Sequence, residues 1–345
     1  MAIITVIGAG MMGSAIIFPA AENHHTIRIV GTPLDRDIIE HARQTGEHLT
    51  LKRRMPEGIT YYQYEQFLEA LEGCDLLVSG VSSFGVDWFL QEIIGRIPES
   101  LPVLSVTKGM IHDGGGALIS YPELYERSTP KKIAFMAVGG PCTSYELADH
   151  DYSAVTFCGR DIALLRKIRA WFETDYYHVS LSTDVRGVEC AVAMKNAYAL
   201  GVALAIGMSY AREGREKEHY NSQAAIFGQA TREMTRLLDV CGGHPSNLPL
   251  GVGDLYVTVY GGRTRRIGIL LGEGMSFEDA MAQLNGVTLE SIVIAGRTAD
   301  AIRARIDAGL SRAEEYPLLL HIDELLRHGK RVNIPWNAFE TEFQL

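Results

Sequence analysis

A lysine and an asparagine stand side by side at Lys195 and Asn196, within a run of small and apolar residues over 190–200. Removing an ammonium group from water is costly, so a lysine in such a run either extends its charged end to solvent or serves chemistry. A positioned lysine can polarise a carbonyl oxygen and exchange a proton with it. From the residue types alone, a helix lysine that extends its charged end to water is the favoured interpretation of Lys195, and this acid–base role is the alternative.

A glycine-rich loop at residues 8–13 follows a predicted strand at 3–7 and opens a helix predicted over 10–21. Gly8 permits the tight turn, Gly10 lets the backbone approach a pyrophosphate, and Gly13 permits close packing of helix on strand. The N–H groups at the start of the helix add positive potential for the phosphates. The loop therefore predicts a dinucleotide site, with an ordinary glycine-rich turn as the alternative. The expected coenzyme contacts here are Gly8, Gly10, Met11, Met12 and Gly13.

The residues after the second predicted strand, 26–30, bear on the choice of coenzyme. An NAD-specific site has an acidic side chain at this point, where it binds the ribose 2′-hydroxyl. The chain has Gly31 and Thr32 instead, and Arg36 follows closely. Because Thr32 and Arg36 can bind a 2′-phosphate, we expect NADP to be preferred to NAD. In the alternative interpretation, Asp35 reaches the ribose and both coenzymes bind.

Short β-rich apolar runs alternate with helical stretches in the first half of the chain, which is typical of a parallel sheet with helices on both faces. From about residue 184 the strand patterns stop and long helical patterns follow. We therefore predict an α/β protein with a Rossmann-like, doubly wound dinucleotide-binding domain over residues 1–183. An all-α substrate and catalytic domain is predicted over residues 184–345. The predicted strands are 3–7, 26–30, 75–81, 103–106, 133–137 and 154–157. The predicted helices of the second domain are 187–208, 224–239, 277–283, 288–307 and 316–327, with Ser276 and Asp279 as a helix cap.

Composition argues against several classes of partner. Asp and Glu (42) outnumber Lys and Arg (32) and no basic block occurs, so neither a nucleic acid nor an anionic membrane surface is an expected partner. Charged Lys195 interrupts the longest apolar stretch, 190–210, which argues against a membrane span. The cysteines are five in number and scattered, which favours free thiols in a reducing, cytoplasmic compartment. The sequence has no metal-ligand spacing, so no metal is expected.

Six motifs stand in order along almost the whole chain. They are Gly8 to Gly13, Val106-Thr107-Lys108-Gly109, Gly139-Gly140-Pro141 with Glu146, Val188-Glu189 with Lys195-Asn196, Gly253-Asp254-Leu255 with Thr258, and Gly262-Arg263 with Leu271-Gly272-Glu273-Gly274. In this order and spacing they resemble the NAD(P)-dependent glycerol-3-phosphate dehydrogenases. The resemblance implies hydride transfer between NAD(P)H and C2 of dihydroxyacetone phosphate, which interconverts this ketone with sn-glycerol 3-phosphate for glycerophospholipid synthesis. The implied partner is a small phosphorylated substrate, and a homodimer is a candidate assembly.

The resemblance assigns roles to residues of the second domain. Lys195 matches the catalytic lysine, whose ammonium protonates the ketone oxygen in reduction and whose neutral amine accepts the hydroxyl proton in oxidation. Asp254 matches its acidic partner, and Thr258, one helical turn later, is expected to hydrogen-bond the lysine or the substrate. Asn196 is implied to hydrogen-bond substrate oxygens.

Lys108 and Arg263 match two cationic residues of the family. Lys108 follows a strand at the carboxyl edge of the sheet, and the resemblance implies that it binds substrate and coenzyme and adds positive charge for catalysis. Arg263 matches the phosphate-binding arginine, also assigned to the coenzyme, and its planar guanidinium suits an oxyanion. Backbone N–H groups at Thr264 and Arg265 are expected to complete the phosphate site.

The chain departs from the family pattern in the loop from Gly253, which is about two residues shorter than the usual form, and in three short segments. Gly262-Arg263-Thr264 stands where Ser-Arg-Asn is common, Gly228-Gln229 where Arg-Gly is common, and Cys142-Thr143 where Ser-Phe is common. Because specificity rests on a few pocket contacts, these changes bear on the substrate but leave the reaction type intact. The alternatives are a reductase of another small keto or hydroxy acid, such as ketopantoate, and a non-catalytic nucleotide-binding protein. Retention of the charged motif residues speaks against the last.

Overall fold

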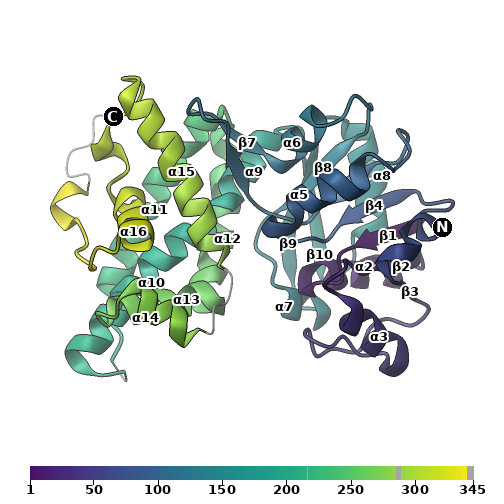
Figure 1. Cartoon of the computed structure of the whole chain (residues 1–345), viewed down its shortest axis with the longest axis horizontal. Helices are drawn as coiled ribbons and strands as arrows, with labels where there is room; N and C mark the ends of the chain where they lie inside the picture. The colour runs from purple at the N-terminus through teal and green to yellow at the C-terminus, as the bar shows by residue number, and fades with distance from the viewer. Residues whose placement is uncertain (216, 285–288, 340–345) are drawn as a thin grey trace. The chain divides into compact units, whose positions relative to one another are not determined.

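The computed structural model describes residues 1–215, 217–284 and 289–339, and the chain divides into two compact units (Figure 1). The first unit comprises Met1–Lys108 and Ser120–Glu189, and the second comprises Gly109–Ile119 and Cys190–Leu345. The segment 109–119 therefore belongs with the second unit, whereas the sequence analysis placed it in the first domain. The predicted domain boundary at residue 184 lies shortly before the division between Glu189 and Cys190.

An eight-stranded sheet is the centre of the first unit, with strand order β10-β9-β8-β5-β4-β1-β2-β3. Its strands are β1 (Ile3–Ile7), β2 (Thr26–Val30), β3 (Thr60–Tyr62), β4 (Leu76–Ser79), β5 (Val103–Ser105), β8 (Phe135–Gly139), β9 (Ser153–Gly159) and β10 (Tyr177–Ser182). Neighbouring strands are parallel except β8 and β9, which are antiparallel. The sheet confirms the predicted Rossmann-like architecture, and it adds β3 and β10, which the sequence analysis did not predict.

The interior strand β1 is buried along nearly its whole length, as is typical of an unbroken run of β-branched residues in a parallel sheet. It pairs with β2 on one side and with β4 on the other, and the last residues of the three strands are in register. The loops that follow them, at Gly8, Gly31 and Gly80, therefore leave the sheet at the same edge.

Helices of the first unit pack on this sheet, and apolar side chains of five of them form a buried cluster with those of the strands. The helices are α1 (Met11–Ala15), α2 (Ile17–Glu22), α3 (Arg36–Thr45), α4 (Phe67–Ala70), α5 (Val86–Phe89), α6 (Tyr121–Arg127), α7 (Ser144–Ala148) and α8 (Ile162–Phe172). The sequence analysis predicted one helix over 10–21, but α1 and α2 are separate helices that meet at Ile16. Pro19 explains the break, because it has no N–H group to donate to the carbonyl of Ala15.

Among its described residues, the second unit is helical apart from β6 (Met110–His112) and β7 (Leu118–Ser120), a hairpin whose first strand packs on α15. The helices are α10 (Lys195–Glu213), α11 (Tyr220–Cys241), α12 (Leu248–Tyr260), α13 (Gly262–Gly272), α14 (Phe277–Gln283), α15 (Glu290–Asp307) and α16 (Pro317–His328), and α9 (Val185–Ala193) leads into the unit. This confirms the predicted helical C-terminal region. Ser276 caps α14 through the N–H of Asp279, as predicted. Residue 288, where a predicted helix begins, lies outside the described residues.

α10 is the core helix of the second unit, and two glycines let α13 touch it. A Cβ atom on Gly268 would lie 2.8 Å from the carbonyl oxygen of Leu200, and one on Gly272 would lie 2.3 Å from that of Leu204. The two helices therefore run in the same direction, and their N-termini lie at the same end of the pair. The stretch Val185–Glu213 is long and apolar enough to cross a membrane, but 89% of its apolar window is buried inside the structure.

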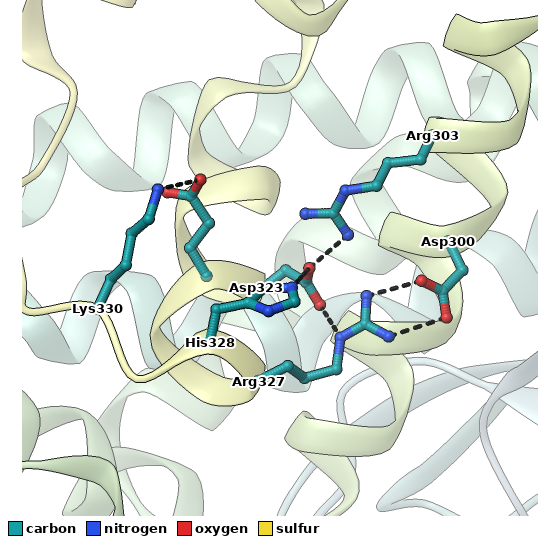
Figure 2. A network of polar contacts seen from close by, with 7 residues as sticks. Asp300, Arg303, Asp323, Arg327, His328 and Lys330 are labelled. Atoms are coloured by element: carbon teal, nitrogen blue, oxygen red, sulfur yellow. Dashed lines mark hydrogen bonds and ion pairs between the residues drawn. The ribbon is translucent and has the colours of Figure 1, made fainter.

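A network of ion pairs joins α15 and α16 (Figure 2). Asp323, completely buried on α16, accepts hydrogen bonds from Arg303, at 2.5 Å, and from Arg327. Arg327 also forms a two-bond pair with Asp300 on α15, at 2.7 and 2.9 Å. The two carboxylates raise the pKa of Arg327, so the positive charge that joins these helices persists at every relevant pH.

Candidate active site

The glycine loop closes against the loop that follows β4. A Cβ atom on Gly8 would lie 2.7 Å from the backbone of Gly80, and one on Gly13 would lie 2.4 Å from the carbonyl oxygen of Gly8. Gly8 also has a φ of 107°, which residues with a side chain rarely adopt. These glycines therefore let α1 begin directly at the carboxyl edge of the sheet, as a dinucleotide site requires.

A cavity of about 450 Å³ lies beside this loop. It is lined by Gly8, Gly10, Thr32, Pro33, Leu34, Asp35, Gly80, Val81, Ser82, Phe84, Gly85 and Trp88. Glycine-loop backbone and two aromatic rings in one cavity suit the phosphates and the flat base of a nucleotide. Met11 and Met12 begin α1, and their side chains pack against the buried cluster. Their backbone N–H groups, at the start of the helix, are the groups that suit a phosphate.

A carboxylate lies at the end of β2 although residues 31 and 32 are not acidic. Asp35 accepts hydrogen bonds from the N–H of Ala9 at 3.1 Å, and from the N–H and hydroxyl of Thr32, each at 2.8 Å. Thr32 and Asp35 both line the cavity. Arg36, in contrast, is exposed and pairs with Glu65. Thr32 therefore remains a candidate coenzyme contact, and Asp35 is a second candidate. The position of Arg36 does not support a contact with the coenzyme.

His48 holds Ala9 from the other side. Its Nε2 lies 2.9 Å from the carbonyl oxygen of Ala9, and its Nδ1 accepts from the N–H of Leu51 at 2.9 Å. Burial lowers the pKa of His48, although the Ala9 carbonyl and Asp35 act in the opposite direction. The sequence analysis did not identify His48, because a lone histidine in the loop after α3 belongs to no motif.

Lys108 follows β5 at the carboxyl edge of the sheet, as predicted. Its ammonium group donates to the carbonyl of Gly140 at 2.6 Å. Gly140 belongs to the Gly-Gly-Pro motif after β8, which is the neighbour of β5, so two of the six motifs meet here. The hydroxyl of Thr107 donates to the carbonyl of Val81 at 2.6 Å and fixes the loop that carries Lys108.

Glu189, from the Val188-Glu189 motif, is completely buried on α9. Among the described residues, neither of its carboxylate oxygens has a hydrogen-bond partner. Burial raises the pKa of Glu189 to about 8, and the charge of Lys108 opposes this shift. The carboxyl group is therefore largely protonated at neutral pH.

Lys195 and Asp254 form an ion pair within the second unit. Lys195 is the first residue of α10, and its ammonium nitrogen lies 2.6 Å from the carboxylate of Asp254 on α12. The Lys195 side chain is 16% exposed and that of Asp254 is completely buried, so a charge-assisted bond holds the ammonium group at the edge of a dry environment. Gly251 permits this approach, because a Cβ atom there would lie 2.3 Å from the carbonyl oxygen of Ala191. One helical turn further along, Asp254 reaches Lys195.

Asn196 and Thr258 lie on the two helices that carry this pair. The amide nitrogen of Asn196 is 3.4 Å from the carboxylate of Glu290, at the start of α15. The Thr258 hydroxyl donates to the backbone carbonyl of Asp254 at 2.7 Å. Because this proton is committed within α12, the Thr258 oxygen is left to accept a hydrogen bond from a lysine or a substrate. Of the roles predicted for Thr258, the structure therefore favours that of a hydrogen-bond acceptor.

The start of α13 provides a helix N-terminus in the same unit. Gly261 is the N-cap, and Gly262, Arg263 and Thr264 form the first turn. Their N–H groups have no carbonyl partner within the helix, which favours a bound anion. Arg265 was predicted to offer such an N–H, but as the fourth helical residue it can bond back to the Gly261 carbonyl. Arg263 is exposed and Thr264 is buried, so Arg263 would contact an anion here with its side chain and Thr264 with its backbone.

Comparison with known proteins places this arrangement in a family. Family models described as the N-terminus and the C-terminus of NAD-dependent glycerol-3-phosphate dehydrogenase match residues 3–164 and 184–336. The NADP(+)-dependent glycerol-3-phosphate dehydrogenase of Archaeoglobus fulgidus is 31% identical over 286 residues, which cover 82% of this chain and 83% of that protein. The chain belongs to the NAD-dependent glycerol-3-phosphate dehydrogenase family. It is an NAD(P)-dependent oxidoreductase that acts on a CH–OH group.

Further relatives of this dehydrogenase match it over nearly its whole length. The glycerol-3-phosphate dehydrogenase [NAD(P)+] of Koribacter versatilis is 27% identical over 336 residues, covering 95% of this chain and 93% of that protein. The solved glycerol-3-phosphate dehydrogenase of Coxiella burnetii superposes with a TM-score of 0.78 at 21% identity, covering 98% and 97% of the two chains. That of Plasmodium falciparum gives 0.83 at 17% identity, covering 100% and 96%. These two structures share the fold of the dehydrogenase.

Proposed function

We propose that this dehydrogenase interconverts dihydroxyacetone phosphate and sn-glycerol 3-phosphate, with Lys195 as general acid and base, and that it supplies glycerol phosphate for glycerophospholipid synthesis. The observation that carries the proposal is the 2.6 Å pair of Lys195 with completely buried Asp254. The relatives described above carry the same activity in their names. A homodimer and a cytoplasmic location remain predictions from the sequence.

Lys195 is the group proposed to move the proton. Bound NAD(P)H supplies the hydride, and the carbonyl oxygen of the substrate then becomes an alkoxide that needs a proton. The Lys195 ammonium donates that proton, and its positive charge stabilises the developing negative charge. Asp254 holds the ammonium group in position through a charge-assisted bond. In the oxidation direction the neutral amine takes the proton from the hydroxyl group.

The start of α13 is the proposed site of the substrate phosphate. N–H groups of the first helical turn and the guanidinium of Arg263 together suit a dianion. The backbone N–H of Thr264 takes the place of the side-chain donor that is common in the family. Lys108 and Asn196 are assigned to substrate binding by their match with family motifs, and Lys108 also adds positive charge.

The glycine loop and the cavity beside it are the proposed coenzyme site. Thr32 lines this cavity, and its hydroxyl, which donates to Asp35 in this structure, can turn to a 2′-phosphate, which supports the use of NADPH. The carboxylate of Asp35 lies in the same cavity, and its negative charge opposes a 2′-phosphate. We therefore propose that NADPH and NADH are both used, with NADPH preferred and Asp35 limiting that preference.

The direct test is an assay at 340 nm with dihydroxyacetone phosphate and each reduced coenzyme. We expect turnover with both coenzymes and a much higher KM for unphosphorylated dihydroxyacetone, because it lacks the charge that α13 binds. Ketopantoate serves as the matched alternative substrate, since a solved ketopantoate reductase of Ralstonia eutropha shares the fold, with a TM-score of 0.57 at 16% identity. Equal reduction of dihydroxyacetone and its phosphate, or preferred reduction of ketopantoate, would contradict the proposal.

A further inference from the structure

Ala9, between the first two glycines of the loop, has both of its backbone polar groups bound by side chains from another part of the first unit. Its N–H donates to Asp35 at 3.1 Å, and its carbonyl oxygen lies 2.9 Å from Nε2 of His48. Asp35 directly precedes α3 and His48 follows it. The segment that contains α3 is therefore attached to the glycine loop at both of its ends.

The hydrogen bonds of His48 define its protonation state. Nδ1 accepts from the N–H of Leu51 at 2.9 Å and from the N–H of Thr50 at 3.3 Å, so Nδ1 carries no proton. In a neutral ring the proton is then on Nε2, which donates it to the carbonyl of Ala9. The residue is 1% exposed. A second proton on Nδ1 would face two N–H groups and would place a charge in the interior.

A fixed carbonyl at Ala9 also fixes the N–H that follows it. The C=O and N–H of one trans peptide point in opposite directions, so binding of the Ala9 carbonyl to His48 turns the N–H of Gly10 away from His48. Gly10 lines the proposed coenzyme cavity. Its N–H is one of the groups that a glycine loop offers to a diphosphate.

We infer that His48 is a positioning residue for the coenzyme: its neutral ring, oriented by the N–H groups of Leu51 and Thr50, holds the Ala9 carbonyl so that the Gly10 N–H is directed to the diphosphate, and a proton on Nδ1 removes the two bonds that orient the ring. The inference rests on the proposed role of the glycine loop in coenzyme binding. The affinity for NAD(P) then depends on His48, although its side chain does not line the cavity.

The titratable groups that act on His48 are Asp35 and His41, and the polar groups that face its ring are the Ala9 carbonyl, the N–H groups of Thr50 and Leu51, and the Thr50 hydroxyl. Burial lowers the pKa of His48 from 6.5; the Ala9 carbonyl and Asp35 oppose this shift, and His41 adds to it. The neutral ring therefore persists through the neutral range. Affinity for the coenzyme should fall only as the pH drops below 6.5.

Two variants test separately the hydrogen bond that His48 donates to Ala9 and the one that it accepts from Leu51. In His48→Gln, the amide nitrogen can take the place of Nε2 and donate to Ala9, and the side chain does not titrate. In His48→Asn, the amide oxygen can take the place of Nδ1 and accept from Leu51, but the shorter side chain does not reach Ala9. The Kd for NAD⁺ is measured by calorimetry from pH 5.5 to 8, with kcat at saturating coenzyme.

At pH 7.5 we expect His48→Asn to bind NAD⁺ about tenfold more weakly than the wild type, because a buried carbonyl loses its donor. His48→Gln should bind within about threefold of the wild type, since the donor is restored. Both variants should keep kcat at saturating coenzyme, because the ring does not touch the reacting atoms. As the pH falls below 6.5 the wild type should lose affinity and His48→Gln should not.

Equal affinity of the wild type and His48→Asn at pH 7.5 would overturn the inference, and so would a pH dependence retained by His48→Gln. A wild-type chain that does not bind NAD⁺ would contradict the proposed function instead. Thermal unfolding of each variant identifies any loss of the fold. If His48→Asn does not fold, the inference is tested by comparing the Kd for NAD⁺ of the wild type with that of His48→Gln across the acid range.

Discussion

Glu189→Gln should stabilise the protein, and the gain should grow as the pH rises. The Glu189 side chain is completely buried, and none of the described residues offers its carboxylate oxygens a hydrogen bond. Burial raises the pKa of Glu189 from 4.5 to about 8. Between these values the folded state keeps a proton that the unfolded state has released, so stability falls as the pH rises.

The expected size of this effect follows from the two pKa values. A difference of one pKa unit corresponds to about 1.4 kcal/mol. The ionisation of Glu189 therefore costs about 1 kcal/mol of stability at pH 5.5 and about 4 kcal/mol at pH 7.5, relative to a group that stays neutral. Glutamine has the shape of the protonated acid and does not ionise. We expect Glu189→Gln to exceed the wild type in unfolding free energy by about these amounts.

Urea unfolding of both proteins at pH 5.5 and pH 7.5 measures the difference. Glu146→Gln is the matched control, because Glu146 is exposed, and it should follow the wild type closely at both pH values. A difference between Glu189→Gln and the wild type that does not grow with pH would refute the reasoning. It would mean that Glu189 is already ionised in the folded protein.

Three further substitutions test other parts of the account. Arg263→Ala should raise KM for dihydroxyacetone phosphate about tenfold to a hundredfold with a smaller change in kcat, because the phosphate is remote from the reacting carbon. An unchanged KM would mean that the phosphate binds elsewhere. Asp35→Asn should raise kcat/KM for NADPH relative to NADH by about tenfold, since one negative charge near the 2′-phosphate is removed; an unchanged ratio would mean that Asp35 does not face the ribose. Asp323→Asn should lower the unfolding free energy by about 3 kcal/mol, because it leaves two arginines without their buried partner. The neighbouring Glu324→Gln removes only the exposed 2.7 Å pair with Lys330 and should stay within about 1 kcal/mol of the wild type; equal losses in the two variants would contradict this interpretation.

The six strands that the sequence predicts all lie inside the sheet, between the edge strands β10 and β3. β1 and β2 are short runs rich in β-branched residues, and they lie inside the sheet. β10 alternates buried Tyr177 and Val179 with exposed His178 and Ser180, and β3 is a three-residue strand at the opposite edge, so neither forms an apolar run. Edge strands of this kind lack the continuous signal by which buried strands are found.

α13 was not predicted as a helix because its glycines lower helix propensity. In the structure Gly268 and Gly272 are needed where α13 touches the backbone of α10. The low helix propensity of these glycines thus opposes helix formation, but the close packing that they permit favours it, and the segment is helical. The same contact places the start of α13 at the end of the pair where α10 begins with Lys195.

The candidate site could be predicted only where a motif carried it. Lys195 and Asp254 lie 59 positions apart, and the match to family motifs, rather than any periodicity, brought them together. The sequence suggested Asp35 only as an alternative ribose contact, and His48 belongs to no motif. Their hydrogen bonds to Ala9 connect positions 26 and 39 residues apart, so these bonds can be found only once α3 is placed beside the glycine loop.

Single-turnover reduction of dihydroxyacetone phosphate tests most directly the claim that Lys195 exchanges a proton with the substrate oxygen. NADPH is bound first to the wild type or to Lys195→Met, the ketone is added in excess, and absorbance at 340 nm is followed at pH 7.5, with the Kd for NADPH measured separately. Methionine keeps most of the packing of the lysine stem. We predict a rate lower by about 10²–10⁴-fold with an unchanged Kd for NADPH. A rate within about tenfold of the wild type would contradict the role of Lys195.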